Sequence, residues 1–142
     1  MANAIGRVLL VEDHLMNQEL ACAILSGIVS DIDIANDGIE AIAAVKAQPY
    51  DLILMDIRMP RMDGVTAVRK IRELPGNAAH TPIIALTAHA MPEQVRSYWQ
   101  AGIDAFVAKP FNREELHRTI YRVLGLPVVQ TMESVRLAAR SN

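Results

Sequence analysis

Five short runs of apolar residues alternate along the chain with segments in which apolar residues recur at helical spacing. The first, third and fourth runs are almost continuously apolar, as is typical of strands buried on both faces of a parallel sheet. The second run alternates Asp with Ile, which indicates an edge strand with one face in water. The five runs are Arg7–Glu12, Asp31–Ala35, Asp51–Asp56, Pro82–Thr87 and Asp104–Lys109.

The segments between the runs have the patterns of amphipathic helices and carry helix-start signals. Asp37–Glu40 and Asn112–Glu115 each place an N-cap residue three positions before a Glu, as in a capping box. Pro92 suits the first turn of a fourth helix. The apolar faces predicted for the first, third and fifth helices are Met16, Leu20, Ile24 and Gly27; Val65, Val68 and Ile71; and Leu116, Ile120, Val123 and Leu124.

Alternation of strand and helix predicts an α/β fold, a single domain with a doubly wound parallel sheet. Five strands with the second at an edge fit the flavodoxin-like (βα)5 order 2-1-3-4-5. Right-handed crossovers then place helices one and five on one face of the sheet and helices two, three and four on the other. We expect the domain to span 7–125, after a leader of residues 1–6 and before a tail or linker, 126–142, for which a short helix is the alternative.

Composition narrows the class of protein without naming a function. The chain has 142 residues, of which 51% are hydrophobic and 21% charged, enough for one domain with a substantial core. A net charge of −2 gives no reason to expect nucleic-acid binding or contact with a membrane surface. The single cysteine, Cys22, cannot form an internal disulfide, and no apolar run is long enough to span a bilayer. We therefore expect a cytoplasmic protein.

Chemically active side chains stand where the predicted strands end. Glu12 and Asp13 close the first strand, Asp56 the third, Thr87 the fourth and Lys109 the fifth. The carboxyl ends of parallel strands meet at one edge of the sheet, which is where such folds bind ligands. Carboxylates about 4 Å apart repel by about 4 kcal/mol per pair at an effective dielectric constant of 20, so a cation should accompany them. Oxygen ligands without His or Cys favour Mg²⁺.

This combination of groups predicts a site that accepts a phosphoryl group. A carboxylate beside Mg²⁺, here Asp56, can act as a nucleophile toward phosphorus and form an aspartyl phosphate. Lys109 supplies a positive charge and Thr87 a hydroxyl donor for the phosphoryl oxygens.

Four motifs in this order resemble the receiver domain of two-component response regulators, including the receivers attached to hybrid histidine kinases. They cover nearly the whole chain apart from its two ends. Each motif alone is weak, but four at the right strand ends are specific. The motifs are VLLVED from Val8, DLILMDIRMPRMDG from Asp51, PIIALTAHA from Pro82 and AFVAKPF from Ala105.

The resemblance implies a magnesium-dependent phosphoacceptor site. In it, Asp56 is similar to the family's phosphoacceptor. Asp13, Asp56 and the backbone carbonyl of Arg58 resemble the Mg²⁺ ligands, and Glu12 assists through water. Mn²⁺ is expected to substitute for Mg²⁺.

The resemblance also assigns residues that respond to phosphorylation. Lys109 is similar to the lysine that pairs with the phosphoryl group, and Pro110 to the proline that follows it through a cis peptide bond. Thr87 resembles the switch hydroxyl, and Phe106 the aromatic residue that turns inward with it. The implied donor is a sensor histidine kinase or a histidine phosphotransfer protein, and the downstream partner or parent-protein domain is unknown. The signal would leave through the face formed by helix four, strand five and helix five, until hydrolysis of the aspartyl phosphate resets it.

Two other classes of protein use related sites. A magnesium-dependent phosphatase of the haloacid-dehalogenase type also forms an aspartyl phosphate, but its general acid would fall at Arg58, which cannot donate a proton at neutral pH. A flavodoxin-like cofactor binder needs backbone amides for a phosphate after the first strand, where this chain has Glu12 and Asp13. We therefore expect a regulatory domain that promotes only its own phosphorylation and dephosphorylation, rather than an enzyme.

Overall fold

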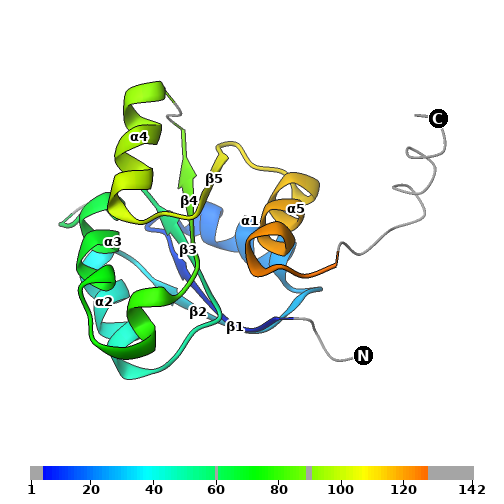
Figure 1. The fold of residues 1–142 in the computed structure, drawn as a ribbon. Coiled ribbons are helices and arrows are strands. Elements are labelled where there is room, and N and C mark those ends of the chain that lie inside the picture. Colours follow the sequence, from blue (N-terminus) through cyan, green and yellow to red (C-terminus); the bar gives the residue numbers. More distant parts are fainter. Residues whose placement is uncertain (1–4, 60, 89–90, 128–142) are drawn as a thin grey trace.

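A computed structural model describes residues 5–59, 61–88 and 91–127. In it, strands and helices alternate along the chain, and the strands form one sheet with helices on both sides (Figure 1). A short 3-10 helix, η1, precedes the fourth strand and was not predicted. The elements are β1 (Ile5–Val11), α1 (Leu15–Leu25), β2 (Val29–Ala35), α2 (Gly38–Ala47), β3 (Leu52–Asp56), α3 (Gly64–Arg72), η1 (Gly76–His80), β4 (Ile83–Thr87), α4 (Pro92–Ala101), β5 (Ala105–Ala108) and α5 (Arg113–Leu124).

The sheet has the predicted strand order, β2-β1-β3-β4-β5, with every neighbouring pair parallel. This confirms the flavodoxin-like topology. All residues of β3 and β4 are buried, as their continuous apolar sequence predicted. β2 lies at the edge, as predicted. The alternation does not bury both Ile residues, however, because Ile34 is 45% exposed while Asp33 is partly buried.

The two faces of the sheet carry separate apolar cores. On one face, residues of α1 and α5 pack on the sheet; on the other, residues of α2, α3 and α4 do so, as predicted. The ribbon shows the same division, with α1 and α5 together on one side (Figure 1). Leu116 and Ile120 of α5 are fully buried, and Val68 and Ile71 of α3 likewise. Because each core is continuous across its face, the sheet edge at the carboxyl ends of the strands is held from both sides.

The predicted apolar face of α1 is wrong. Met16 is 82% exposed and Leu20 45% exposed, whereas Ile24 alone of the predicted helical set is buried. The helix instead buries Gln18, Ala21, Ile24 and Leu25. The helix carries apolar residues on more than one of its sides. The small Ala21, which has no exposed surface, lies on the buried side. A polar Gln within the buried series concealed the true face from a hydrophobic count.

The predicted helix starts are confirmed, but only the N-cap half of each predicted capping box is found among the described contacts. The side chains of Asp37 and Asn112 accept hydrogen bonds from the backbone N–H groups of Glu40 and Glu115. Glu40 does not complete a capping box, because its carboxylate accepts from the N–H of Asn36. Pro92 stands in the first turn of α4.

Gly64 opens α3 at a point of close backbone contact. A Cβ atom there would lie 2.3 Å from the carbonyl oxygen of Asp56 and 2.9 Å from the Cα of Ile57. The Gly64 N–H donates to the carbonyl of Ile57 at 2.9 Å. The absence of a side chain therefore lets α3 begin directly against the end of β3.

The predicted tail, 126–142, falls largely outside the described residues, since 128–142 are not among them. Nor are residues 1–4 of the predicted leader, although β1 already begins at Ile5. No helix within the described part of the chain is long and apolar enough to cross a membrane.

Candidate functional site

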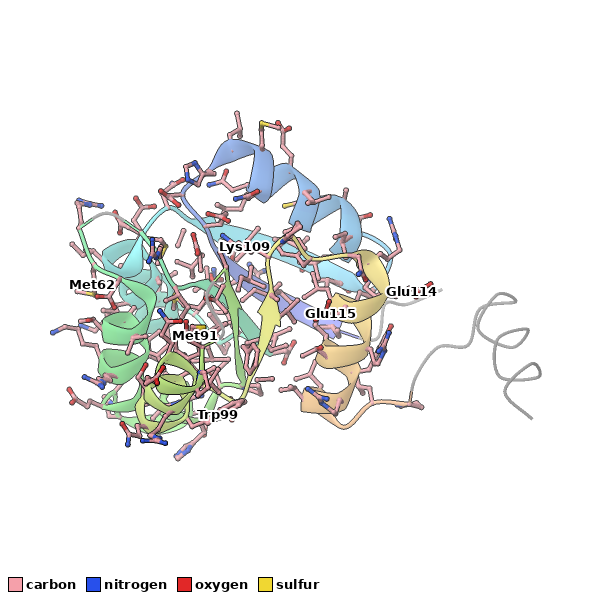
Figure 2. The ribbon with its side chains drawn as sticks, turned by 90° about the horizontal axis from the view of Figure 1, so that it is seen from above. Met62, Met91, Trp99, Lys109, Glu114 and Glu115 are labelled. Atoms are coloured by element: carbon pink, nitrogen blue, oxygen red, sulfur yellow. The ribbon has the colours of Figure 1, made fainter. Side chains whose placement is uncertain are left out.

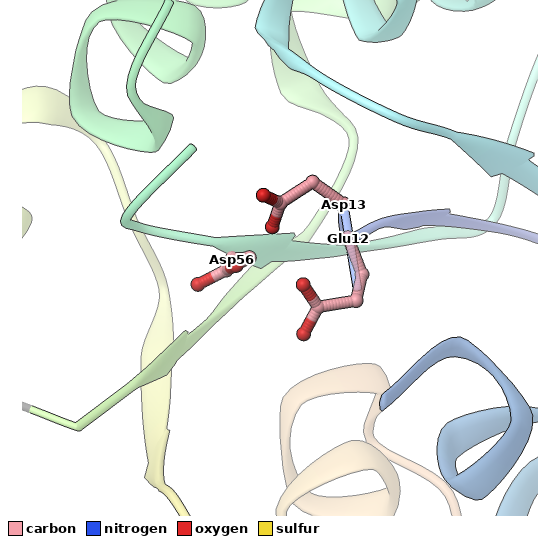
Figure 3. Close-up of side chains that lie close together, drawn as sticks. All are labelled: Glu12, Asp13 and Asp56. Atoms are coloured by element: carbon pink, nitrogen blue, oxygen red, sulfur yellow. The ribbon is translucent and has the colours of Figure 1, made fainter. Parts of the chain in front are cut away.

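Three carboxylates form an acid cluster at the carboxyl ends of the two central strands. Glu12 and Asp13 directly follow β1, and Asp56 is the last residue of the adjacent β3. One carboxylate oxygen from each residue lies within 4.8 Å of the others. The side chains converge from the two strand ends (Figure 3). Glu12 and Asp56 are buried, with 1% and 3% of their surfaces exposed. The sheet thus brings together all three acids that the sequence predicted there.

Lys109 supplies the positive charge beside the acid cluster. Its Nζ lies 3.0 Å from Glu12 Oε1 and 3.1 Å from Asp56 Oδ1. It follows β5 and extends toward the ends of the central strands (Figure 2), and the Lys109–Pro110 peptide bond is cis, as the resemblance implied. The ammonium group contacts two of the three carboxylates of the cluster, so negative charge remains in excess within this group.

Burial and the neighbouring charged groups shift the pKa values of groups in the site. Burial, together with the neighbouring Glu12 carboxylate, raises the pKa of Asp56 to about 6, although Lys109 acts in the opposite direction. Burial also acts to raise the pKa of Glu12, but the hydrogen bonds that it accepts from Asp56 and Lys109 outweigh burial and lower it. Burial acts to lower the pKa of Lys109, but its two carboxylate neighbours outweigh burial and raise it. Ionised Asp56 is therefore the least well-compensated charge of the three shifted groups.

One oxygen of the acid cluster fits the requirement of a cation. Asp13 Oδ1 is buried and has no hydrogen-bond partner among the described residues. A buried polar atom without a partner costs free energy unless a ligand or water satisfies it. The donor set consists of carboxylate oxygens only, which suits a hard divalent cation such as Mg²⁺. The residues present therefore fit the predicted metal.

Backbone and side-chain hydrogen bonds fix the positions of the cluster residues. Gln18, which sequence reasoning did not select, donates from Nε2 to the carbonyl of Glu12 at 2.6 Å and to Asn36 Oδ1 at 2.9 Å. It thereby ties the turn after β1 to the turn after β2. The backbone N–H of Arg58 donates to Asp56 Oδ1 at 3.2 Å, which places Arg58 beside the cluster. The predicted role of the Arg58 carbonyl as a ligand stays a prediction.

The remaining predicted residues, Thr87 and Phe106, lie on β4 and β5. Thr87 is the last residue of β4 and is buried, with 2% of its surface exposed. Its Oγ1 lies 3.0 Å from the hydroxyl of Tyr98 on α4, in a buried hydrogen bond. Phe106 is partly buried, and its ring contacts those of Tyr98 and Trp99. Tyr98 was not selected from the sequence, where two adjacent aromatic residues, Tyr98 and Trp99, do not show which one is buried.

Residues 8–121 match the family model of the response regulator receiver domain. Over 115 residues the chain is 41% identical to the signal transduction histidine-protein kinase BarA of Escherichia coli K12, covering 81% of this chain and 12% of BarA. Over 117 residues it is 38% identical to the transcription factor SKN7 of Saccharomyces cerevisiae, covering 82% of this chain and 18% of SKN7. The chain thus spans less than a fifth of the length of these relatives.

Solved structures show the same likeness in three dimensions. The receiver domain of the sensor histidine kinase PA1611 of Pseudomonas aeruginosa PAO1 superposes with a TM-score of 0.77 at 41% identity, covering 87% of this chain and 99% of that one. That structure has a magnesium ion coordinated in its active site cleft. The chemotaxis protein CheY4 of Vibrio cholerae gives a TM-score of 0.76 at 32% identity, covering 84% of this chain and 99% of that one. Sequence and backbone therefore agree over most of the chain.

Proposed function

The chain belongs to the family of response regulator receiver domains of two-component signalling, and on that premise we propose that it is a switch in which Asp56 accepts a phosphoryl group. The observation that carries the proposal is the acid cluster with Lys109 held against Glu12 and Asp56. Independent surface acids have no reason to gather in a largely buried group in which one oxygen has no partner among the described residues. A site that receives a cation and an anionic group accounts for both features.

Asp56 is the acceptor of choice among the three acids. It ends the central strand β3, is buried, and lies 3.1 Å from the only amine in contact with the cluster among the described residues. With a pKa of about 6 it is largely ionised at neutral pH, so a carboxylate is available to attack phosphorus. Lys109 and a backbone N–H contact both Glu12 and Asp56, but the pKa of Glu12 is lowered, whereas that of Asp56 is raised.

The transfer itself breaks one bond and forms another. An oxygen of Asp56 bonds to phosphorus while the P–N bond of a phosphohistidine on the donor breaks. The electron pair of that bond returns to the histidine nitrogen, and the ring, protonated on its other nitrogen, leaves as a neutral imidazole. The product on this chain is an aspartyl phosphate. Lys109 is placed to follow the charge onto the new phosphoryl oxygens, and Thr87 donates a hydrogen bond to one of them. Asp13, Asp56 and the Arg58 carbonyl would hold Mg²⁺, with Glu12 acting through water. When bound, the ion neutralises charge on the phosphoryl oxygens.

The donor, the location and the output follow from the same premise. We infer that a sensor histidine kinase or a histidine phosphotransfer protein is the donor, and that both partners meet in the cytoplasm. Residues 7–125 form the unit that is phosphorylated. The output passes through the face of α4, β5 and α5, and hydrolysis of the aspartyl phosphate ends the signal. The domain regulates, and we expect no turnover of small phosphate esters.

Intact-mass spectrometry after incubation with acetyl phosphate and Mg²⁺ tests the proposal. We expect the wild-type chain to gain the mass of a single phosphoryl group and the Asp56→Asn variant to gain none. Asp51→Asn is the matched control, because Asp51 is an exposed acid that precedes the same strand at its other end. An Asp56→Asn protein modified as fully as the wild type would refute the assignment.

A further inference from the structure

A buried hydrogen bond joins the end of β4 to the middle of α4. Thr87 Oγ1 and the Tyr98 hydroxyl oxygen are 3.0 Å apart, and the two residues are 2% and 3% exposed. Either hydroxyl can be the donor, because each has one proton and lone pairs that accept. The bond therefore links the sheet edge that carries the acid cluster to a helix on its flank.

Thr87 lies close to Asp56 and Lys109 through the backbone of the sheet. In the sheet register Asp56 pairs with Leu86, the residue before Thr87. The backbone N–H of Lys109 donates to the carbonyl of Thr87 at 2.7 Å. A phosphoryl oxygen has only lone pairs, so Thr87 must turn its one proton toward it to form a hydrogen bond. When Thr87 is the donor to Tyr98 at rest, that turn breaks the bond or reverses its direction.

Tyr98 in turn adjoins aromatic groups that reach the surface. Its ring meets that of Phe106 in an edge contact with centroids 6.5 Å apart, and Trp99 meets the same Phe106 ring at 5.9 Å. Trp99 is 47% exposed on α4 (Figure 2). Tyr98 also lines an open cavity of about 570 Å³ between α3 and α4.

We propose that Tyr98 is a positioning residue that transmits the state of Thr87 to the α4 surface. The Thr87–Tyr98 hydrogen bond stabilises the resting arrangement. Its loss or reversal on phosphorylation moves the Tyr98 ring, and Phe106 and Trp99 move with it. The inference rests on the proposed function, because it needs a phosphoryl group on Asp56 to draw Thr87 away. It adds a second aromatic residue, from a helix, to the switch predicted from β4 and β5.

The Tyr98→Phe variant tests this coupling because it removes the hydroxyl and keeps the ring. Trp99 is the only tryptophan of the chain, so its emission reports on this surface alone. The probe is beryllofluoride with Mg²⁺, an analogue of the phosphoryl group. We expect the midpoint concentration of beryllofluoride to fall about fivefold in the variant, the equivalent of about 1 kcal/mol. The resting emission should also shift toward the wild-type bound value, because the resting arrangement has lost a neutral hydrogen bond.

Two further variants separate coupling from a general packing effect. Tyr121→Phe removes the hydroxyl of another buried tyrosine, from α5 on the opposite face, and should leave the midpoint unchanged. In a Thr87→Ala background, Tyr98→Phe should cause no further change, because the hydroxyl then has no Thr87 to hold.

An unchanged midpoint and resting emission in Tyr98→Phe would overturn the inference, and so would a fivefold effect that persists without the Thr87 hydroxyl. The proposed function fails separately: in that case the wild-type chain itself takes up neither beryllofluoride nor a phosphoryl group.

Discussion

The two ends of the sheet differ in how completely their charged side chains are paired. At the amino ends of β4 and β5, the guanidinium of Arg72 lies within 3.0 Å of all its partners, and its donors are all used. It donates to the carbonyls of Ala79, Thr81 and Gly102 and to the carboxylate of Asp104. At the carboxyl ends, Glu12 and Asp56 share the ammonium group of Lys109, and Oδ1 of the third acid, Asp13, has no partner among the described residues.

The same contrast separates individual carboxylates. Asp33 on the edge strand accepts from Tyr50, Arg7 and Gln48 through one oxygen, and the Tyr50 hydroxyl and these other donors hold its pKa below the usual value. The pKa of Asp56 is raised instead, to about 6. Polar groups that stabilise a fold are matched by their own chain, whereas a group kept for a ligand is left short of partners. The predictions below test that difference.

The largest expected effect is at the matched end. Replacing Arg72 with Met should lower the free energy of unfolding by about 3 kcal/mol, because three backbone carbonyls and Asp104 lose their donors. Urea denaturation measures the loss. Lys70→Met is the control, since Lys70 is exposed on the same helix and should change stability by less than about 0.5 kcal/mol. Equal effects of the two changes would contradict the description of Arg72 as a structural centre.

Asparagine substitutions at Asp56 and Asp33 should act with opposite signs. In chelator at about pH 8, Asp56→Asn should raise the free energy of unfolding by about 2 kcal/mol, and Asp33→Asn should lower it by less than about 1 kcal/mol because Asp33 is one-third exposed. The raised pKa of Asp56 means that ionised Asp56 costs stability, a cost that appears as pH rises from about 4 through 6. The lowered pKa of Asp33 gives stability that is present above about pH 4 and is lost as pH falls.

Unfolding curves from about pH 4 to 8 distinguish the two cases. Asp56→Asn should approach the wild type from above at the acid end. Asp33→Asn should stay below the wild type over this whole range, because the contribution of Asp33 is lost only as pH falls below about 4. A destabilised Asp56→Asn protein at about pH 8 would show that Lys109 compensates Asp56 fully, against the raised pKa.

Mg²⁺ at modest concentration should have a smaller effect than Asp56→Asn. At ten times its dissociation constant, Mg²⁺ should raise the free energy of unfolding by about 1.4 kcal/mol through mass action. The gain should be greater at about pH 8 than at about pH 5, where Asp56 carries a proton. Asp13→Asn should remove most of the gain, whereas Asp33→Asn should retain it. Thermal melts with and without Mg²⁺ measure both, and a wild-type curve that ignores Mg²⁺ would refute the metal site.

The fold and the acid cluster were accessible from sequence because their signals are local. Continuous apolar runs identify central strands, the alternation in β2 identifies an edge, and each chemically active residue stands at a strand end. Parallel topology then places Glu12, Asp13, Asp56 and Lys109 together without knowledge of any contact. The roles assigned to these residues remain proposals until phosphorylation and metal binding are measured.

What the sequence missed depends on contacts between distant segments. The buried face of α1 includes Gln18, which donates hydrogen bonds to the carbonyl of Glu12 and to Asn36. A pattern of hydrophobic residues cannot predict such bonds. Met16 and Leu20 fitted the helical period but face away from the core. Tyr98 on α4 is significant because its hydroxyl is hydrogen-bonded to Thr87 on β4, a contact between separate elements. Periodicity reports which residues share a face, but not which of two apolar faces meets the sheet.

Because Gly64 has no side chain, the first residue of α3 packs directly against the backbone carbonyl of Asp56. A methyl group at that position would have to push either the helix or the acid-bearing strand end aside, whatever its polarity. At this point main-chain atoms limit how closely α3 and the acid-bearing strand end can approach each other, so the start of the helix and the acid cluster cannot shift independently here.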